Sequence, residues 1–281
     1  MPSPSDARLS SRIRPRRKKK SEYLIQSVAN ALDVLEALAQ QSEETGVTDL
    51  ARRLHLHKNN VFRLLATLQT RDYVEQNPDS ESYRLGLASL SLGRGFLQQT
   101  RLLRHAREAL EEISSRLGET AHVAVARGEE AVTLDGVEPE RTLRVIARPG
   151  MARPFHATAE GKVLAALDPA GESTDPGTWA GRSLRRYTAA TCTDPHRLAE
   201  EMKEIAARAW AADRGEFEEG IAGMATPVRD HAGRVIATLS ISLPLNRLNS
   251  PGVEEPFALF MSEAASRLSH RLGYRDPAAD D

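Results

Sequence analysis

Hydrophobic residues recur at helical spacing in three short segments near the start of the chain. Ser27 and Thr48 precede the first apolar positions of two of these segments and are expected N-caps. Two short strand-like runs follow, separated by a polar turn. Three helices and a hairpin in this order predict a winged helix-turn-helix. The helices are expected at residues 27–39, 48–54 and 57–68, and the strands at 73–75 and 83–85.

The third of these helices has one apolar face and one polar face. Val61, Leu65 and Leu68 share a narrow stripe, while Asn59 and Arg63 lie on the opposite side. Arg and Asn side chains form paired hydrogen bonds with guanine and adenine, so this face suits base reading. A surface helix with no binding role shows the same pattern, but the neighbouring hairpin favours a DNA-reading helix. The residues expected to contact DNA are Arg52, Arg53, His57, Lys58, Asn59, Asn60, Arg63 and Thr70.

The remaining chain begins with helical periodicity and then alternates between strand and helix patterns. Three strands, then helices, then three more strands predict an α+β domain with a mostly antiparallel six-stranded sheet covered by helices. Such a sheet can leave a pocket beneath the covering helices. The strands are expected at 121–126, 131–137, 142–148, 210–213, 221–229 and 234–243, the helices at 87–101, 103–117, 158–167, 194–209 and 253–272, and a Gly/Pro-rich loop at 169–182.

Charge is distributed unevenly along the chain. Residues 1–86 carry 14 Lys and Arg against 11 Asp and Glu, whereas the rest carries 24 against 28, for a net charge of −1. The first 22 residues combine eight basic side chains with Ser and Pro, which predicts a disordered arm. That arm either contacts DNA phosphates or has no binding role. A single cysteine excludes an intramolecular disulfide and fits a cytoplasmic setting.

The sequence offers no convincing catalytic or metal-binding set. The spacing of a phosphate-binding loop is absent, and His55 and His57 have no third ligand nearby. Cys192 and His196 lie four residues apart, a spacing that commonly arises by chance. We therefore expect no catalytic residue, metal or cofactor. The alternative is a small-molecule enzyme or sensor whose winged domain mediates protein contacts.

Several motifs, in preserved order and spacing, resemble the IclR family of bacterial transcriptional regulators. They include the run 58–65, the tetrapeptide 83–86, the run 156–162, the segment 219–230 and the tripeptide 240–242. The resemblance spans about residues 24–272. It implies a homodimer, which can pair into a dimer of dimers, that binds an inverted-repeat operator under the control of a small organic effector. The implied organisation is a basic arm (1–22), a winged helix-turn-helix (23–86), a linker helix (87–101), a GAF-like effector-binding domain (102–273) and a flexible tail (274–281).

The resemblance also implies an effector site, in which two positions depart from the family pattern. Gly223 stands where cysteine is frequent, and Glu160 where a small residue is usual. Because Glu160 would repel an acidic ligand at the helix N-terminus unless it is paired, we expect an effector other than a simple 2-oxo acid: larger, neutral or amine-bearing. Ser240 and Ser242 either bind a ligand or lie on an ordinary exposed strand face. The implied contacts are Ala159, Glu160, Asp213, Ile221, Gly223, Ser240 and Ser242.

Overall fold

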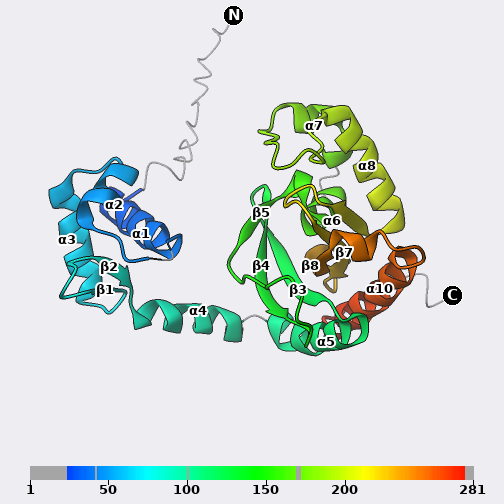
Figure 1. Cartoon of the computed structure of the whole chain (residues 1–281), viewed down its shortest axis with the longest axis horizontal. Helices are drawn as coiled ribbons and strands as arrows, with labels where there is room; N and C mark the ends of the chain where they lie inside the picture. The colour runs from blue at the N-terminus through cyan, green and yellow to red at the C-terminus, as the bar shows by residue number, and fades with distance from the viewer. Residues whose placement is uncertain (1–23, 42, 100, 169–171, 276–281) are drawn as a thin grey trace, which may run out of the picture. The chain divides into compact units, whose positions relative to one another are not determined.

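The computed structural model describes residues 24–41, 43–99, 101–168 and 172–275. The chain divides into two compact units, of which the first ends at Phe96 and the second begins at Leu97 (Figure 1). The basic arm expected at 1–22 and most of the tail expected at 274–281 lie outside the described residues. Within the described ranges, no helix is both long and apolar enough to cross a membrane.

The first unit is the predicted winged helix-turn-helix. Its helices bury one apolar stripe each against a common core, and its two strands pair as an antiparallel hairpin. The core is formed mainly by Val34, Leu38, Leu50, Val61, Leu65, Leu68 and Tyr83. The elements are α1 (Gln26–Ala39), α2 (Val47–Arg53), α3 (Lys58–Gln69), β1 (Val74–Gln76) and β2 (Tyr83–Leu85), followed by α4 (Leu87–Gln99).

The predicted N-caps of the first two helices are wrong. Helix α1 begins one residue before Ser27 and α2 one residue before Thr48, so both hydroxyls lie inside the first turn. The residue that precedes each helix makes no side-chain cap. Helix α3 is instead capped by His57, whose Nδ1 accepts a hydrogen bond from the backbone N–H of Asn59 at 3.3 Å.

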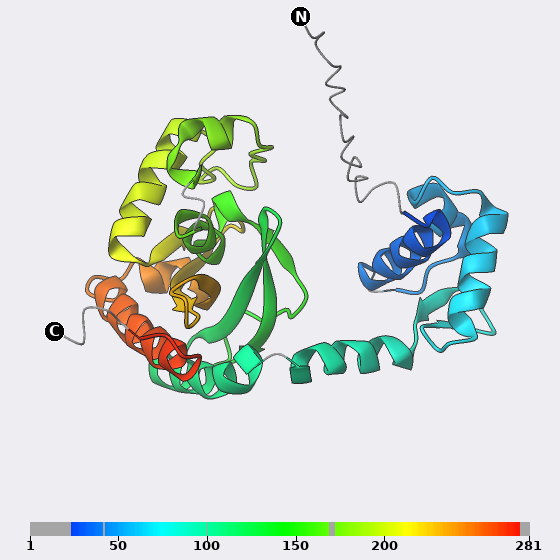
Figure 2. The ribbon, with the colours of Figure 1, turned by 180° about the vertical axis from the view of Figure 1, so that it is seen from behind.

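The second unit is built on a six-stranded sheet in which every pairing is antiparallel, as predicted (Figures 1 and 2). The order across the sheet is β5-β4-β3-β8-β7-β6, so the two halves of the sheet meet where β3 pairs with β8. The strands are β3 (Thr120–Arg127), β4 (Glu130–Val137), β5 (Ala152–Pro154), β6 (Ala211–Arg214), β7 (Ile221–Arg229) and β8 (Val235–Pro244).

Helices cover both faces of this sheet. Leu239, Ile241 and Leu243 of β8 point to a core that they share with α5 (Arg101–Leu117) and α10 (Glu254–Arg271), which lie side by side in Figures 1 and 2. The alternate positions face the other side, which is covered by α6 (Ala159–Ala166) and α8 (Pro195–Arg208). Short helical turns complete this unit: η2 (Phe155–Ala157), η3 (Glu172–Thr174), α7 (Pro176–Ala180) and α9 (Leu245–Leu248).

Two predictions for this unit are wrong. Residues 142–148 form no strand. Arg144 pairs with Glu138 at 2.7 Å, and the Thr120 hydroxyl donates to the Val145 carbonyl. Side-chain contacts therefore hold this segment where backbone strand pairing was expected. The third strand of this half is β5. The segment 169–182 is not only loop, because η3 and α7 lie within it and the Trp179 side chain of α7 is buried.

Candidate DNA-binding surface and effector site

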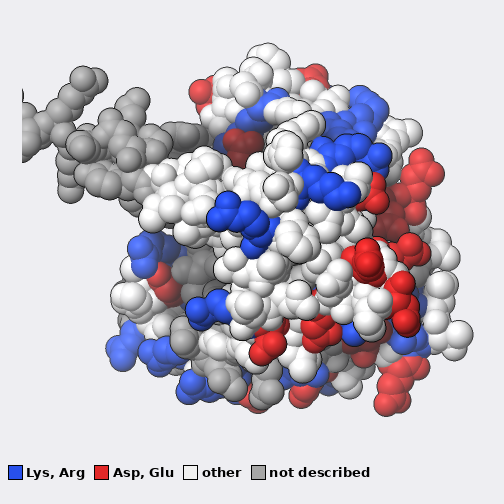
Figure 3. All heavy atoms as spheres, turned by 90° about the vertical axis from the view of Figure 1, so that its left-hand side faces the viewer, with Lys and Arg blue, Asp and Glu red and all other residues white. Residues whose placement is uncertain are grey.

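Helix α3 carries an exposed polar face over a buried apolar one. All eight residues predicted to contact DNA are exposed, from Arg52 on α2 to Thr70 at the end of α3. The predicted set combines the positive charges of Lys58 and Arg63 with the uncharged hydrogen-bonding groups of Asn59 and Asn60. In the space-filling view of the chain, Lys and Arg side chains form several separate groups (Figure 3).

The side chains on this surface differ in what already holds them. Arg52 pairs with Asp49 at 2.6 Å, and the Thr70 hydroxyl donates to the Thr67 carbonyl at 2.7 Å. The side chains of Lys58, Asn59, Asn60 and Arg63 make no hydrogen bond or ion pair within the described part of the chain. These four are free to turn towards a ligand.

Phe62, which the sequence analysis did not single out, also lies on this surface. Phe62 is 53% exposed and lies one turn after Asn59 on α3. It lines a hollow of about 680 Å³ between the starts of α2 and α3 and the hairpin. An exposed aromatic residue on a polar face was the signal that could have identified it.

Three of the seven predicted effector residues form a row across the second unit's sheet. Asp213 of β6 is opposite Gly223 of β7, which is opposite Ser242 of β8, and Ser242 is opposite Thr120 of β3. Ser240 lies two residues from Ser242 on the same face, where its hydroxyl donates to that of Thr238 at 3.2 Å. Both serines are buried, so the alternative of an ordinary exposed strand face is wrong.

The N-terminus of α6 lies over this row. The Thr158 hydroxyl caps the helix by accepting from the Gly161 N–H at 3.2 Å. Gly161 packs against the preceding turn so closely that a Cβ would lie 2.5 Å from the Phe155 Cα. A Cβ on Gly223 would lie 3.5 Å from the Ala159 side chain and 3.5 Å from Asp213 Oδ2. The predicted residues of the helix and the sheet are therefore close together.

Glu160, in the first turn of α6, is buried and paired. Its Oε1 accepts from Arg153 Nη1 at 3.1 Å and lies 3.8 Å from His122 Nε2, a distance too long for a hydrogen bond. Burial raises the pKa of Glu160, but the His122 and Arg153 side chains outweigh burial and hold this pKa at about 2. The carboxylate is therefore charged, and its charge is compensated within the protein.

Asp213 has the opposite electrostatic character. Burial raises its pKa to about 7, while the hydrogen bond from the Glu216 N–H to its Oδ1, at 2.8 Å, works against this rise. The nearby Glu216 and Glu160 carboxylates also raise the pKa of Asp213, and the Lys162 ammonium lowers it. Asp213 is thus a buried acid that exchanges its proton close to neutral pH.

A cavity of about 400 Å³ opens beside these residues. Among the seven predicted effector residues, only Ile221 lines it, while the six others are buried and do not line it. Arg153 connects the cavity with the buried effector residues, because it lines the cavity and also bonds to Glu160. The cavity is lined by Leu143, Arg144, Val145, Ile146, Arg148, Met151, Arg153, Glu218, Glu219, Gly220, Ile221 and Pro244.

Lys162 is fully buried behind this site. Its Nζ lies 2.7 Å from Glu201 Oε1 and 2.6 Å from Glu216 Oε1. Burial alone would lower the pKa of Lys162, but the Glu216 and Glu201 carboxylates outweigh burial and raise it. This ion-pair cluster ties α6 to α8 and to the turn that follows β6.

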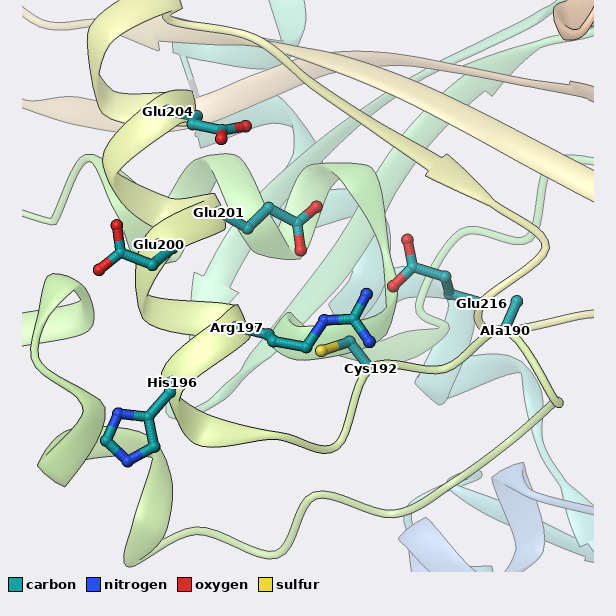
Figure 4. A pocket seen from close by; sticks show the side chains of 8 residues that line it. All are labelled: Ala190, Cys192, His196, Arg197, Glu200, Glu201, Glu204 and Glu216. Atoms are coloured by element: carbon teal, nitrogen blue, oxygen red, sulfur yellow. The ribbon is translucent and has the colours of Figure 1, made fainter.

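A second cavity, of about 580 Å³, lies beside α8 (Figure 4). In that view the His196 ring and the Cys192 thiol lie on opposite sides of the start of the helix, so they do not form a nucleophile and base. The other residues that line it are charged, apart from Ala190. In the described ranges, no three His, Cys, Asp or Glu side chains are placed to hold a metal ion.

Two family profiles match this chain. Residues 27–78 match one described as the IclR helix-turn-helix domain, and residues 95–270 match one described as the bacterial transcriptional regulator IclR C-terminal domain. Together the two profiles cover most of the sequence.

Curated proteins and solved structures give the same picture. XynR and KdgR of Escherichia coli, both HTH-type transcriptional regulators, are each 33% identical to the chain, over 89% and 90% of it and over 98% and 94% of their own lengths. IclR of Thermotoga maritima is 27% identical over 89% of the chain and 99% of its own, with a TM-score of 0.70. An IclR homologue of Microbacterium hydrocarbonoxydans, complexed with 4-hydroxybenzoate, is 25% identical over 88% of the chain and 98% of its own, with a TM-score of 0.74.

Proposed function

The chain belongs to the IclR family of transcriptional regulators, and from this membership we propose which of its surfaces bind DNA, a second copy of the chain and an effector. It is a DNA-binding regulator with a C-terminal effector-binding domain. The family consists of transcriptional regulators and not of enzymes, which argues against the alternative of an enzyme with a winged domain. A regulator of bacterial genes acts where the chromosome is, so we place this one in the cytoplasm.

The exposed face of α3 is the observation that carries the DNA proposal. Lys58, Asn59, Asn60 and Arg63 have no partner within the described chain, so they can bond to base edges without breaking an internal contact. Phe62 adds an apolar group that suits contact with a thymine methyl. Arg52, Arg53, His57 and Thr70 lie at the edges of this face and are assigned to phosphates and neighbouring groups.

Two apolar surfaces in the first unit support a homodimer. Ile25, Val28 and Leu32 line one exposed side at the start of α1, and Leu87 and Leu90 are exposed on α4. Exposed apolar groups gathered on one face mark a protein interface. A second copy that covers them gives a two-fold protein, which matches an operator with inverted repeats because each α3 then meets an equivalent half-site.

The effector acts by preferring one arrangement of this dimer. A ligand shifts an equilibrium only by its difference in affinity for the two states. The row of buried polar groups below α6, together with the adjoining cavity, supports the second unit as its binding site. The relative complexed with 4-hydroxybenzoate supports an organic ligand. Residues 87–101 then act as the linker that transmits the change to the winged domain.

Operator binding tests this proposal directly. The full chain is titrated by fluorescence anisotropy onto the DNA upstream of its own coding region and onto random DNA of equal length. We expect a preference of at least about 10³ for the upstream DNA and a steep salt dependence. Footprinting is expected to reveal an inverted repeat. Equal affinity for both DNAs at all salt concentrations would reject the proposal.

A further inference from the structure

Arg153 has one hydrogen-bonded edge and one unpaired nitrogen. Its Nη1 donates to Glu160 Oε1 at 3.1 Å, whereas its buried Nε has no acceptor in the described part of the chain. The side chain is only 14% exposed, so water does not readily replace the missing acceptor. Leaving a buried charged donor unpaired is unfavourable, which indicates that an acceptor from outside the chain completes this group.

His122 of β3, which is separated from β5 by β4, also has an unpaired nitrogen. Its side chain is 3% exposed, and its Nε2 has no hydrogen-bond partner among the described residues. This nitrogen lies 3.8 Å from the same Glu160 oxygen that Arg153 holds. Two buried nitrogen atoms around one carboxylate therefore lack hydrogen-bond partners among the described residues.

The cavity that Arg153 lines supplies room for a ligand and an apolar surface. Its volume of about 400 Å³ falls in the range of small-molecule sites. Val145, Met151 and Ile221 provide apolar walls, and no acidic side chain other than the exposed Glu218 and Glu219 lines it among the described residues. An organic body fits these walls, with a charged end directed at Arg153.

We propose that Arg153 is the carboxylate anchor of the effector site. The Nε–Nη2 edge of a guanidinium is one of the two edges that can bind a carboxylate through two parallel hydrogen bonds, and here Glu160 occupies only Nη1. Glu160 thus positions the guanidinium, and the effector carboxylate binds its other edge. The ligand class is an organic acid with an apolar or aromatic body. This inference rests on the proposed function, which places the effector in the second unit.

Pairing of Glu160 also changes the expectation drawn from its charge. The sequence suggested that this carboxylate repels acidic ligands unless it is paired. It is paired with Arg153 and lies close to His122, so the reason for excluding a simple 2-oxo acid no longer holds.

Matched acids and amides test the anchor on the full chain. The probes are benzoate, 4-hydroxybenzoate and phenylacetate, each compared with its uncharged amide, by thermal shift and calorimetric titration. We expect at least one acid to raise the Tm and its amide to leave it unchanged. Arg153→Met is expected to weaken binding of that acid about 10- to 100-fold, and Arg153→Lys by a similar factor because an ammonium cannot form the paired contact. Arg127→Met, an exposed position on the same unit, is expected to bind like the wild type.

A double variant keeps the test valid if Arg153→Met fails to fold. Arg153→Met with Glu160→Leu removes both charges together, so no unpaired carboxylate is left buried. The inference is overturned if none of the acids binds, if the amides bind as well as the acids, or if the double variant binds the acids like the wild type. Operator affinity, measured on the same preparations, separates this failure from a failure of the proposed regulator.

Discussion

At the scale of single residues, side chains on the DNA-binding face fall into bound and free groups. Arg52 is held by Asp49, whereas Arg63 has no partner within the described chain. A held guanidinium is suited to a fixed phosphate contact, because its direction is already set. A free one at the centre of the exposed face can adapt its geometry to a base edge.

Arg63→Ala is therefore expected to relax specificity. We expect a loss of roughly 1–3 kcal/mol at one base pair of the operator and little loss on random DNA. Arg53→Ala, which removes an exposed charge from the neighbouring helix, is the matched control and should weaken binding to all sequences alike. Anisotropy titrations on the operator and on single-base variants measure both. Uniform weakening by Arg63→Ala would contradict base contact.

Asp213→Asn is expected to remove a pH dependence of stability. The folded pKa of about 7 exceeds the ordinary value of 3.8, so between these values the folded state holds a proton that the unfolded state has released. The contribution of Asp213 to wild-type stability therefore falls as pH rises from about 4 to about 7, by at most about 1.4 kcal/mol per pH unit, and is level above that. An amide does not titrate, so the variant should gain stability relative to the wild type across this window.

Urea denaturation between pH 4.5 and 8 measures that difference. Both tryptophans, Trp179 and Trp210, lie in the second unit, so their fluorescence reports its unfolding alone. Contributions of groups that do not interact with Asp213 cancel when variant and wild type are compared at each pH. A difference in stability that does not change with pH would contradict the raised pKa of Asp213.

At the scale of elements, periodicity predicted most of the fold. The apolar stripe of α3 and the helix expected at 194–209 follow from local patterns, and the structure confirms both. The segment 142–148 was mistaken for a strand because strand propensity does not reveal whether a partner edge is available. Side-chain bonds hold it instead, and β5 takes the pairing with β4.

The site was predictable only where family motifs mark it. Asp213, Gly223 and Ser242 come together because three strands pair in register, and the resemblance already pointed to them. Arg153 and His122 were missed because their proximity to Glu160 depends on how β5, β3 and α6 pack. No periodic pattern in the sequence encodes that packing.

Lys162 joins three elements, so its removal is expected to loosen the second unit. Lys162→Met keeps an apolar stem but leaves two partly buried carboxylates unpaired, which should lower the free energy of unfolding by about 3 kcal/mol. Adding Glu216→Gln to Lys162→Met should recover part of this stability because one buried charge is removed. Tryptophan-monitored urea denaturation measures both. A single variant as stable as the wild type would show that the cluster does not hold these elements together.

At the scale of the whole molecule, charge is divided between the two parts of the chain. Residues 1–86 carry a small excess of basic side chains, whereas the rest is mildly acidic. More than half of the basic residues in that first stretch precede residue 21. The winged domain itself is therefore only modestly charged, and much of the general attraction to DNA is assigned to the preceding arm.

Deleting residues 1–22 should consequently weaken DNA binding without changing sequence preference. Removing one phosphate contact makes the slope of log K against log salt shallower by about 0.9, and affinities for operator and random DNA should fall by the same factor. Anisotropy titrations between about 50 and 200 mM salt measure the slope and the ratio together. A full-length variant with the eight basic residues replaced by Gln controls for chain length and should match the deletion. An unchanged slope would mean that the arm does not contact DNA. Phosphate contacts that are independent of sequence leave the ratio of operator affinity to random-DNA affinity constant. A reduced preference for the operator would therefore mean that the arm reads sequence.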